Sequence, residues 1–432
     1  MRLLRLFLIF GFSIIYLPLL AQQSRQEIYS KIRRAEVLSE SGVKNDRKEA
    51  FAIISGIKSG AILENDLWAI GFSSQAMGYF YYRSKQDVKA FQSLYDAINY
   101  SQMADTVDHY LIGSGMEMMG TICNQYDLYE SSIYFKRQAL MYFDQCITLH
   151  GYKIGKRREF PSHFYRLKYF LASNYLAIDS VAIGLDILHE VYHNAQLEND
   201  DLNRDRALNM LGGHYSEVGQ YDSAKYYFSK LINDSGTVKK YKAFAYQNLS
   251  KLHVKLNELD QAHDRIKKSI LLHGRHSGKR YRFRALRDLG NIYMELGELK
   301  HALEIFQRAI KLFPESDKPE EYIVYQTISQ LYEREGEFPL AETYKSLFEE
   351  RKNQYQRKEA LILQEGVREK FMALIEKLKD NKIRKEVARD YTLYAILCSI
   401  FLAGVIAFYF LRRRMTQKRA MIRKLGDILL DD

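Results

Sequence analysis

The sequence predicts an all-α protein in which about eight helix pairs stack into a superhelical solenoid. Apolar residues recur at helical spacing over most of the chain, and one pattern of residues returns about every 40 positions. Only five prolines occur among 432 residues, which suits long helices because proline lacks the backbone N–H that a helix interior requires. With 33 tyrosines and 23 phenylalanines, the chain can build a core along its whole length.

The best-formed unit of this pattern runs from Leu289 to Pro314. It contains two helical apolar stripes in succession: Leu289, Tyr293 and Leu296, then Leu299, Ala302, Leu303, Phe306 and Ile310. Gly297 between the stripes predicts a tight turn, and Pro314 predicts the end of the second helix. Gly290 and Ala309 are small residues at positions where the two helices must approach closely. The unit is therefore interpreted as two short helices joined at Gly297.

The same offsets recur along the chain. The large apolar positions that open each unit are Val37, Met77, Met119, Leu171, Leu211, Leu249, Leu289 and Ile328. This pattern resembles a tetratricopeptide repeat, although the unit here exceeds that family's usual length of about 34 residues, and another helical repeat is the alternative. The resemblance implies a superhelical array over residues 22–350 whose concave face binds an extended or short helical peptide. The longest spacing predicts a surface insertion near residues 147–161.

Both ends of the chain predict membrane targeting. Arg2 and Arg5 precede an apolar stretch, so residues 1–21 are assigned to a signal peptide, with an uncleaved anchor as the alternative. Residues 391–411 are uncharged and long enough to cross a hydrocarbon core of about 30 Å. Three arginines follow directly, so the positive-inside rule predicts a short basic cytosolic tail over residues 412–432. We therefore expect a single-pass protein of the cell (inner) membrane with periplasmic or extracellular repeats.

The segment 351–390 predicts a long stalk helix that leads into the span. Its apolar residues have helical spacing, and Gly366 is its single glycine. Phe371, Leu374 and Leu378 form a short coiled-coil seam. A parallel homodimer through this stalk is a further expectation.

The net charge of +11 does not indicate nucleic-acid binding, because the signal peptide contributes +2 and the tail +4, which leaves +5 over the remainder. The sequence contains no phosphate-binding glycine loop and no nucleophile elbow. His189 and His193 share a helix face, but no nearby His or Cys completes a metal site. The sequence therefore predicts no enzyme, no catalytic residue, no metal and no cofactor.

Candidate ligand-binding residues lie on the first helix of each pair, which lines the concave face in tetratricopeptide proteins. Those expected to point away from the partner helix are Arg166, Asn209, Gln247, Lys251, Arg284, Arg287 and Asn291. Arg284, Arg287 and Asn291 share one helix face, and arginine binds carboxylates with two parallel hydrogen bonds. This face predicts an anion or acidic-peptide site, with a solvated basic face as the alternative. A second candidate is the aromatic group Phe72, Tyr79 and Tyr82, for which core packing is the alternative.

We therefore expect a membrane-anchored, non-enzymatic interaction scaffold whose exported repeats bind a peptide or protein partner. The chain also resembles the exported front half of bacterial single-span sensors with tetratricopeptide ectodomains. A phosphoacceptor histidine is not expected, because no histidine follows His301. A receptor subunit stays open as the alternative: one part of a split or shortened sensor kinase or regulator, signalling through the stalk and the span.

Overall fold

The computed structural model describes residues 24–41, 43–104, 107–150, 160–274, 278–312, 319–364 and 366–380. All regular secondary structure in these residues is α-helical, so the predicted all-α class is confirmed. The chain divides into two compact units, residues 1–371 and 372–432, and the repeats belong to the first.

The predicted membrane elements lie outside the described residues. This applies to the signal peptide, the span at 391–411 and the basic tail, and also to most of the insertion near 147–161. Within the part of the chain that is described, no helix is both long enough and apolar enough to cross a membrane.

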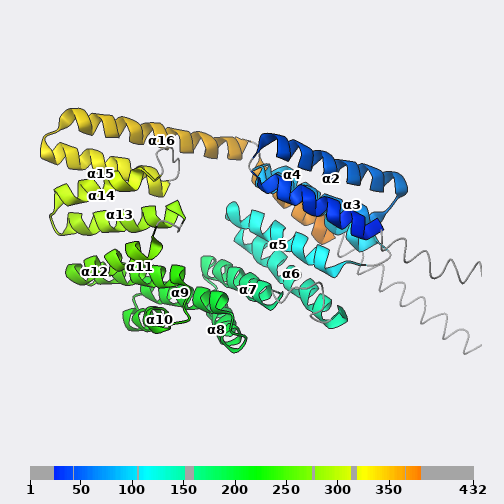
Figure 1. Ribbon diagram of the computed structural model, residues 1–432, viewed down its shortest axis with the longest axis horizontal. Coiled ribbons are helices and arrows are strands. Elements are labelled where there is room, and N and C mark those ends of the chain that lie inside the picture. Colours follow the sequence, from blue (N-terminus) through cyan, green and yellow to red (C-terminus); the bar gives the residue numbers. More distant parts are fainter. Residues whose placement is uncertain are drawn as a thin grey trace, which may run out of the picture. The chain divides into compact units, whose positions relative to one another are not determined.

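The helices follow one another in pairs (Figure 1). The eight pairs are residues 24–40 with α2 (Lys44–Glu64), α3 (Leu67–Arg83) with α4 (Asp87–Met103), α5 (His109–Gln125) with α6 (Tyr129–His150), α7 (Phe160–Ala177) with α8 (Val181–Leu197), α9 (Asp201–Glu217) with α10 (Tyr221–Asn233), α11 (Lys239–Lys255) with α12 (Leu259–His273), α13 (Lys279–Glu295) with α14 (Leu299–Ile310), and α15 (Pro319–Glu335) with α16 (Phe338–Gln364). Each predicted opening position falls in the first helix of one pair, so the predicted repeat count is confirmed.

Small residues allow the two helices of a pair to touch. A Cβ atom on Gly290 would lie 2.6 Å from the ring of Phe306, which is buried. Where serine takes the place of glycine, its hydroxyl reaches across the pair: Ser250 Oγ donates to the Ala262 carbonyl at 2.7 Å. The close approach of the two helices that was inferred at Gly290 is thus confirmed, and another pair achieves it with a serine at the corresponding position.

The turn inside each of the seven pairs from α3/α4 to α15/α16 contains a left-handed residue. Gly297 has φ 75°, and the next residue, Glu298, donates its N–H to the Tyr293 carbonyl at 2.9 Å, which closes the last turn of α13. Asp127 and Asn257 hold the corresponding positions of other pairs at φ 56° and 59°. Aspartate and asparagine tolerate this conformation better than most residues. The turn predicted at Gly297 is therefore confirmed.

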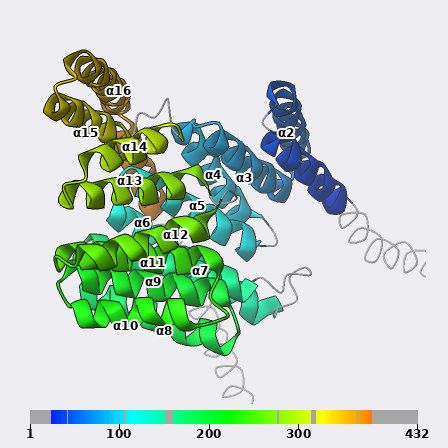
Figure 2. The ribbon, with the colours of Figure 1, turned by 60° about the vertical axis from the view of Figure 1, so that its left-hand side comes forward.

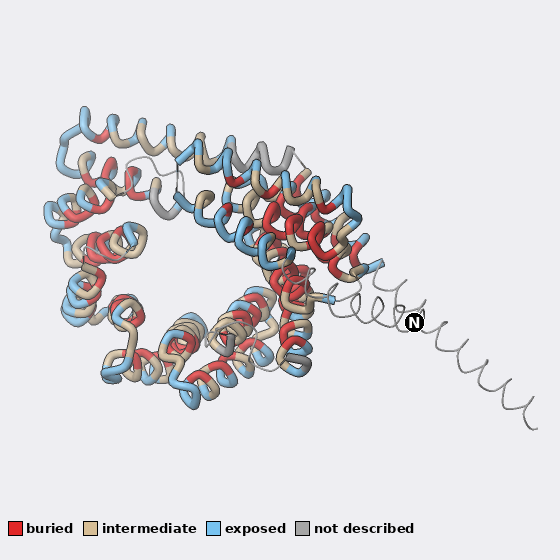
Figure 3. Tube along the Cα trace, turned by 45° about the vertical axis from the view of Figure 1, so that its right-hand side comes forward, coloured by how far each residue is buried: buried red, intermediate tan, exposed pale blue. Residues whose placement is uncertain are grey.

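Successive pairs stack in chain order (Figure 2), and each second helix packs against the first helix of the next pair. Direct contacts join α3 to α5, α7 to α9, α9 to α11 and α11 to α13. Among the described helices, no two consecutive second helices make contacts of that extent. The first helices therefore form the inner face of the array. Figure 3 shows buried residues where helices face one another and exposed residues on the outer sides.

The region predicted as a stalk contains a break. Helix α16 ends at Gln364, Gly366 has φ 56°, and a further helix occupies residues 367–380. A positive φ directs the chain out of the preceding helix, and glycine adopts it without a steric penalty. The glycine that the sequence singled out thus lies between these two helices.

The predicted seam residue Phe371 packs inside the first unit. Its ring stacks on Phe91 with 4.7 Å between centroids and meets the edge of Tyr126 at 5.1 Å. The Arg368 guanidinium donates twice to the Tyr126 carbonyl, at 2.7 and 3.0 Å. Phe371 is fully buried by these contacts within the chain, so it does not lie on an exposed seam.

Candidate functional site

Four of the seven predicted ligand-binding residues come together between α11 and α13. Gln247 and Lys251 are one turn apart on α11, and Arg287 and Asn291 are one turn apart on α13. Asp288 lies among them and accepts hydrogen bonds from Gln247 Nε2 at 2.6 Å and Arg287 Nη2 at 3.0 Å. Lys251 Nζ is 3.4 Å from the same carboxylate. One carboxylate therefore ties the first helices of two neighbouring pairs together.

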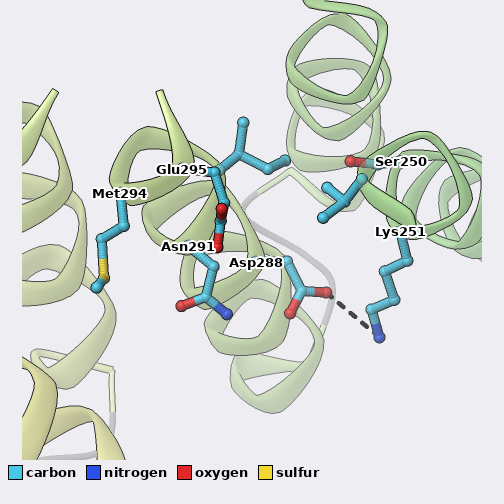
Figure 4. Close-up of a pocket in the computed structure, with 8 residues that line it drawn as sticks. Ser250, Lys251, Asp288, Asn291, Met294 and Glu295 are labelled. Carbon is cyan, nitrogen blue, oxygen red and sulfur yellow. Dashed lines mark ion pairs between the residues drawn. The ribbon is translucent and has the colours of Figure 1, made fainter. Parts of the chain in front are cut away.

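A cavity of about 290 Å³ opens beside this cluster. It is lined by Ser250, Lys251, Val254, Asp288, Asn291, Ile292, Met294 and Glu295. Figure 4 shows Lys251 and Asp288 directed at each other, with Asn291 beside Asp288. Val254, Ile292 and Met294 form the apolar part of the wall. Pockets for whole small ligands hold about 300–1,000 Å³, so this cavity lies at the lower limit of that range and has room for one or two side chains of a longer ligand.

Asp288 changes the charge of the face on which an anion site was predicted. Its side chain is 9% exposed, against 22% for Arg287 and 49% for Lys251. Both cations share Asp288 as their counter-ion, and Glu295 adds a second carboxylate to the lining. A buried carboxylate needs such donors, because an uncompensated buried charge costs several kcal/mol. Lys251 and Arg287 therefore have a counter-ion within the chain.

Asn291 is one uncommitted polar group of the cavity lining. It is exposed, and its amide has no hydrogen-bond partner among the described residues. An asparagine side chain offers both a carbonyl acceptor and an NH₂ donor, which together match the two groups of a peptide bond. The arrangement can therefore hold a backbone amide of a ligand beside the apolar wall.

Sequence reasoning missed Asp288. This residue follows Arg284 by four positions and precedes Asn291 by three, so the spacing that selected those two residues also places a carboxylate on their face. The spacing therefore predicts Asp288 on this face as well, beside the basic and amide residues.

The other three predicted residues lie elsewhere. Arg284 is one turn before Asp288 on α13 and does not line the cavity. Asn209 Oδ1, on α9, accepts a hydrogen bond from Asn248 Nδ2 at 3.1 Å. Arg166 Nη2, on α7, is 3.2 Å from a carboxylate oxygen of Glu117 on α5. Asn209 and Arg166 thus connect neighbouring first helices.

Two of the three residues of the predicted aromatic group line a second, larger cavity, and the third does not. Phe72 and Tyr79 line this cavity of about 1200 Å³, which lies between the helix at 24–40, α3 and α5. Tyr82 is not part of its lining, and its hydroxyl accepts a hydrogen bond from Gln125 Nε2 at 2.7 Å.

Comparison with known sequences identifies one repeat. The tetratricopeptide repeat pattern matches residues 283–316, which cover most of α13 and all of α14. The resemblance stated for the unit from Leu289 to Pro314 is therefore confirmed there. No protein with a curated description matches the chain.

Several solved structures are similar in fold. The chain is similar to the apo form of the quorum sensor NprR from B. thuringiensis, with 13% identity, a TM-score of 0.47, and coverage of 76% of this chain and 99% of that one. It is similar to apo RapI, with 13% identity, a TM-score of 0.46, and coverage of 66% and 99%. PilF from Pseudomonas aeruginosa gives 15% identity, a TM-score of 0.36, and coverage of 50% and 90%. At these identities the similarity concerns the fold alone.

Proposed function

We propose that this chain is a membrane-anchored, non-enzymatic interaction protein whose inner helix face binds a peptide or an extended segment of a partner protein. The observation that carries the proposal is the cavity between α11 and α13. In it an apolar wall lies next to the uncommitted amide of Asn291 and the ion-paired cluster around Asp288. A peptide offers the complement to these features, since it alternates side chains with backbone amides.

The size of the cavity indicates a ligand that spans several repeats. Burying one aliphatic side chain against Val254, Ile292 and Met294 contributes about 2 kcal/mol, whereas micromolar affinity requires about 8 kcal/mol. A ligand that filled this cavity alone would bind weakly. An extended segment that also contacts other first helices would reach useful affinity.

The membrane location belongs to the same proposal. The uncharged stretch 391–411 and the arginines that follow it support a single span with exported repeats and a cytosolic tail. Anchoring would hold the peptide-binding face close to the membrane, where it could recruit its partner.

A receptor subunit is the second candidate function. The observation that favours it is the contact of Arg368 and Phe371 with Tyr126 at the end of α5. This contact links the stretch that leads toward the predicted span to a repeat far away in sequence. A ligand on the inner face could act on the span through such a link.

Photo-crosslinking in cells tests the peptide-binding proposal. Benzoylphenylalanine at Glu295, an exposed residue of the cavity lining, should form a covalent adduct with one defined partner segment. The matched control is Leu271 on α12, which is 79% exposed and belongs to a second helix. Asn291→Ala should reduce the adduct about tenfold, since it removes two hydrogen bonds to the ligand.

The control at position 271 distinguishes specific binding at the inner face from unspecific crosslinking. Equal adducts from positions 295 and 271 would mean that the inner face has no special role, and the proposal would be rejected. Retention of the adduct in the Asn291→Ala variant would remove the amide from the binding mechanism.

A further inference from the structure

The larger cavity, between the helix at 24–40, α3 and α5, has an aromatic wall. Four of its lining residues carry aromatic rings: Tyr29, Phe72, Tyr79 and Tyr110. At about 1200 Å³ it exceeds the cavity between α11 and α13 and can admit a long side chain. All of its lining residues belong to the first unit.

The rings beside this cavity already hold one cation. Tyr29 packs against Phe72 with 4.5 Å between centroids, and Phe72 stacks on Trp68 at 5.2 Å. The Arg25 guanidinium lies over the Trp68 ring at 4.8 Å. The face of an aromatic ring carries partial negative charge and attracts cations. This group of rings is therefore arranged in a way that suits a positive group.

The charged residues of the lining also favour a positively charged ligand group. Glu36 and Asp108 contribute two carboxylates, and Arg33 contributes one cation, so the lining carries a formal charge of −1. Asp108 also caps α5 by accepting the N–H of Leu111 at 3.0 Å. A carboxylate keeps further acceptor capacity after one such bond. Acidic and aromatic residues thus share one wall.

The hydroxyl of Tyr79 is available to a ligand. It has no hydrogen-bond partner among the described residues, although Tyr79 lines the cavity. Burial raises the pKa of Tyr79 well above its ordinary value, and the nearby Glu117, Tyr110 and Glu36 raise this pKa further, while Arg166 opposes them. Tyr79 is therefore a neutral group in a region of negative potential, where it can accept a hydrogen bond from a cationic donor.

We propose that this cavity binds a lysine or arginine side chain of the partner segment. The aliphatic stem of such a side chain would lie along the rings, and its charged end would meet Glu36, Asp108 and the Tyr79 hydroxyl. The inference rests on the proposed function and specifies its ligand. The part of the bound segment that contacts the first three helix pairs would therefore carry a basic residue.

The chain contains its own reporter for this cavity. Trp68 is the single tryptophan, and it stacks on Phe72, which lines the cavity. Three acetylated and amidated heptapeptides, Ala-Gly-Ala-X-Ala-Gly-Ala with X as Lys, Gln or Glu, would be titrated into the purified full chain. We expect the Lys peptide to change Trp68 fluorescence with an affinity about tenfold higher than the Gln peptide, and the Glu peptide to leave it unchanged.

Variants identify the acidic contribution. Glu36→Gln should weaken binding of the Lys peptide about five-fold, and Tyr79→Phe about three-fold. The control is Glu27→Gln on the same helix, because Glu27 pairs with Lys31 at 2.7 Å and does not line the cavity. Glu36 is exposed, so the variant should keep the circular dichroism spectrum of the parent chain. Equal effects of the variants at Glu36 and Glu27 would overturn the proposal.

A second measurement separates this inference from the proposed function. The same peptides with an amino-terminal fluorescein report binding anywhere on the chain through their anisotropy. A change in anisotropy without a change in Trp68 fluorescence would overturn the basic-side-chain site and leave peptide binding intact. Equal affinity for the Lys, Gln and Glu peptides would overturn the charge preference. No change in either signal up to about 10 mM Lys peptide would overturn the basic-side-chain site, whereas the crosslinking at position 295 tests the proposed function by itself.

Discussion

At the scale of single residues, glycines in helix interiors differ sharply in what they do. Gly212 and Gly213 are neighbours in α9. A Cβ atom on Gly212 would lie 2.6 Å from the ring of Phe228, whereas a Cβ atom on Gly213 would meet nothing within 4 Å. Phe228 is fully buried, so its ring cannot move aside without disturbing the core. The first glycine is therefore required by packing, and the second only lowers the helix propensity.

This contrast predicts opposite effects of the same substitution. Gly212→Ala should lower the free energy of unfolding by about 1–3 kcal/mol, because overpacking outweighs the gain in helix propensity. Gly213→Ala should raise it by up to about 1 kcal/mol, since only the propensity changes. Urea unfolding followed by circular dichroism would measure both. A stabilising Gly212→Ala would show that α9 and α10 can separate at no cost.

At the scale of helices, the junction of α11, α12 and α13 buries a histidine. The His273 ring lies at 5.5 Å from Phe244 of α11 and at 6.0 Å from Tyr281 of α13, measured between centroids. Neither ring nitrogen has a hydrogen-bond partner among the described residues. Burial, with a smaller contribution from Lys240, lowers the pKa of His273 to about 4. The neutral form is thus part of the packed junction.

The junction should weaken in acid. Above the unfolded-state pKa of about 6.5, His273 is neutral in the folded and the unfolded chain, so its titration does not change the free energy of unfolding. As the pH falls from there toward 4, the unfolded chain binds a proton that the folded chain does not, so stability is lost in that window. After allowance for solvent screening, the loss should be about 2 kcal/mol.

The measurement compares urea unfolding midpoints at about pH 7.5 and about pH 4.5. His273→Phe keeps an aromatic ring between Phe244 and Tyr281 but cannot take up a proton. Its midpoint should fall less than that of the parent chain over the same range. An identical fall in both proteins would assign the acid sensitivity to other groups.

At the scale of the whole molecule, two kinds of contact join residues that are far apart in sequence. The first helices of neighbouring pairs exchange polar contacts, as between Gln247 and Asp288 and between Asn248 and Asn209. The contact of Arg368 with the Tyr126 carbonyl spans 242 positions. Nearest-neighbour contacts propagate stability along a repeat array, whereas this longer contact adds a constraint that a simple array lacks.

Removal of the Phe371 ring tests this constraint. Phe371→Ala should destabilise the local contact by about 3 kcal/mol or more, because a fully buried phenylalanine is replaced by a small residue. Backbone amides of residues 366–371 should then exchange hydrogen faster, while those of α11 and α13 should not change. Lys370→Ala, at an exposed neighbour, is the control. Unchanged exchange in the Phe371→Ala variant would show that the contact contributes no stability.

The sequence by itself determined the repeat, its number and its turns. A helical stripe such as Leu289, Tyr293 and Leu296, a small residue at Gly290 and a left-handed turn at Gly297 are local features, which depend on neighbours within one pair. Such features are visible in the order of the residues because helix periodicity is fixed. The residues that approach each other between α11 and α13 were also predicted in part, namely Gln247, Lys251, Arg287 and Asn291.

Only the tertiary structure decided which of these residues remain available to a ligand. Gln247 and Asp288 are 41 positions apart, and their hydrogen bond exists because two pairs stack, which no local pattern specifies. That stacking gives Arg287 and Lys251 a shared counter-ion and leaves Asn291 uncommitted. It likewise encloses an aromatic cavity with helices from three pairs and buries Phe371 against Phe91. Charge balance and burial depend on distances across the fold, and for this reason the order of the residues alone did not reveal them.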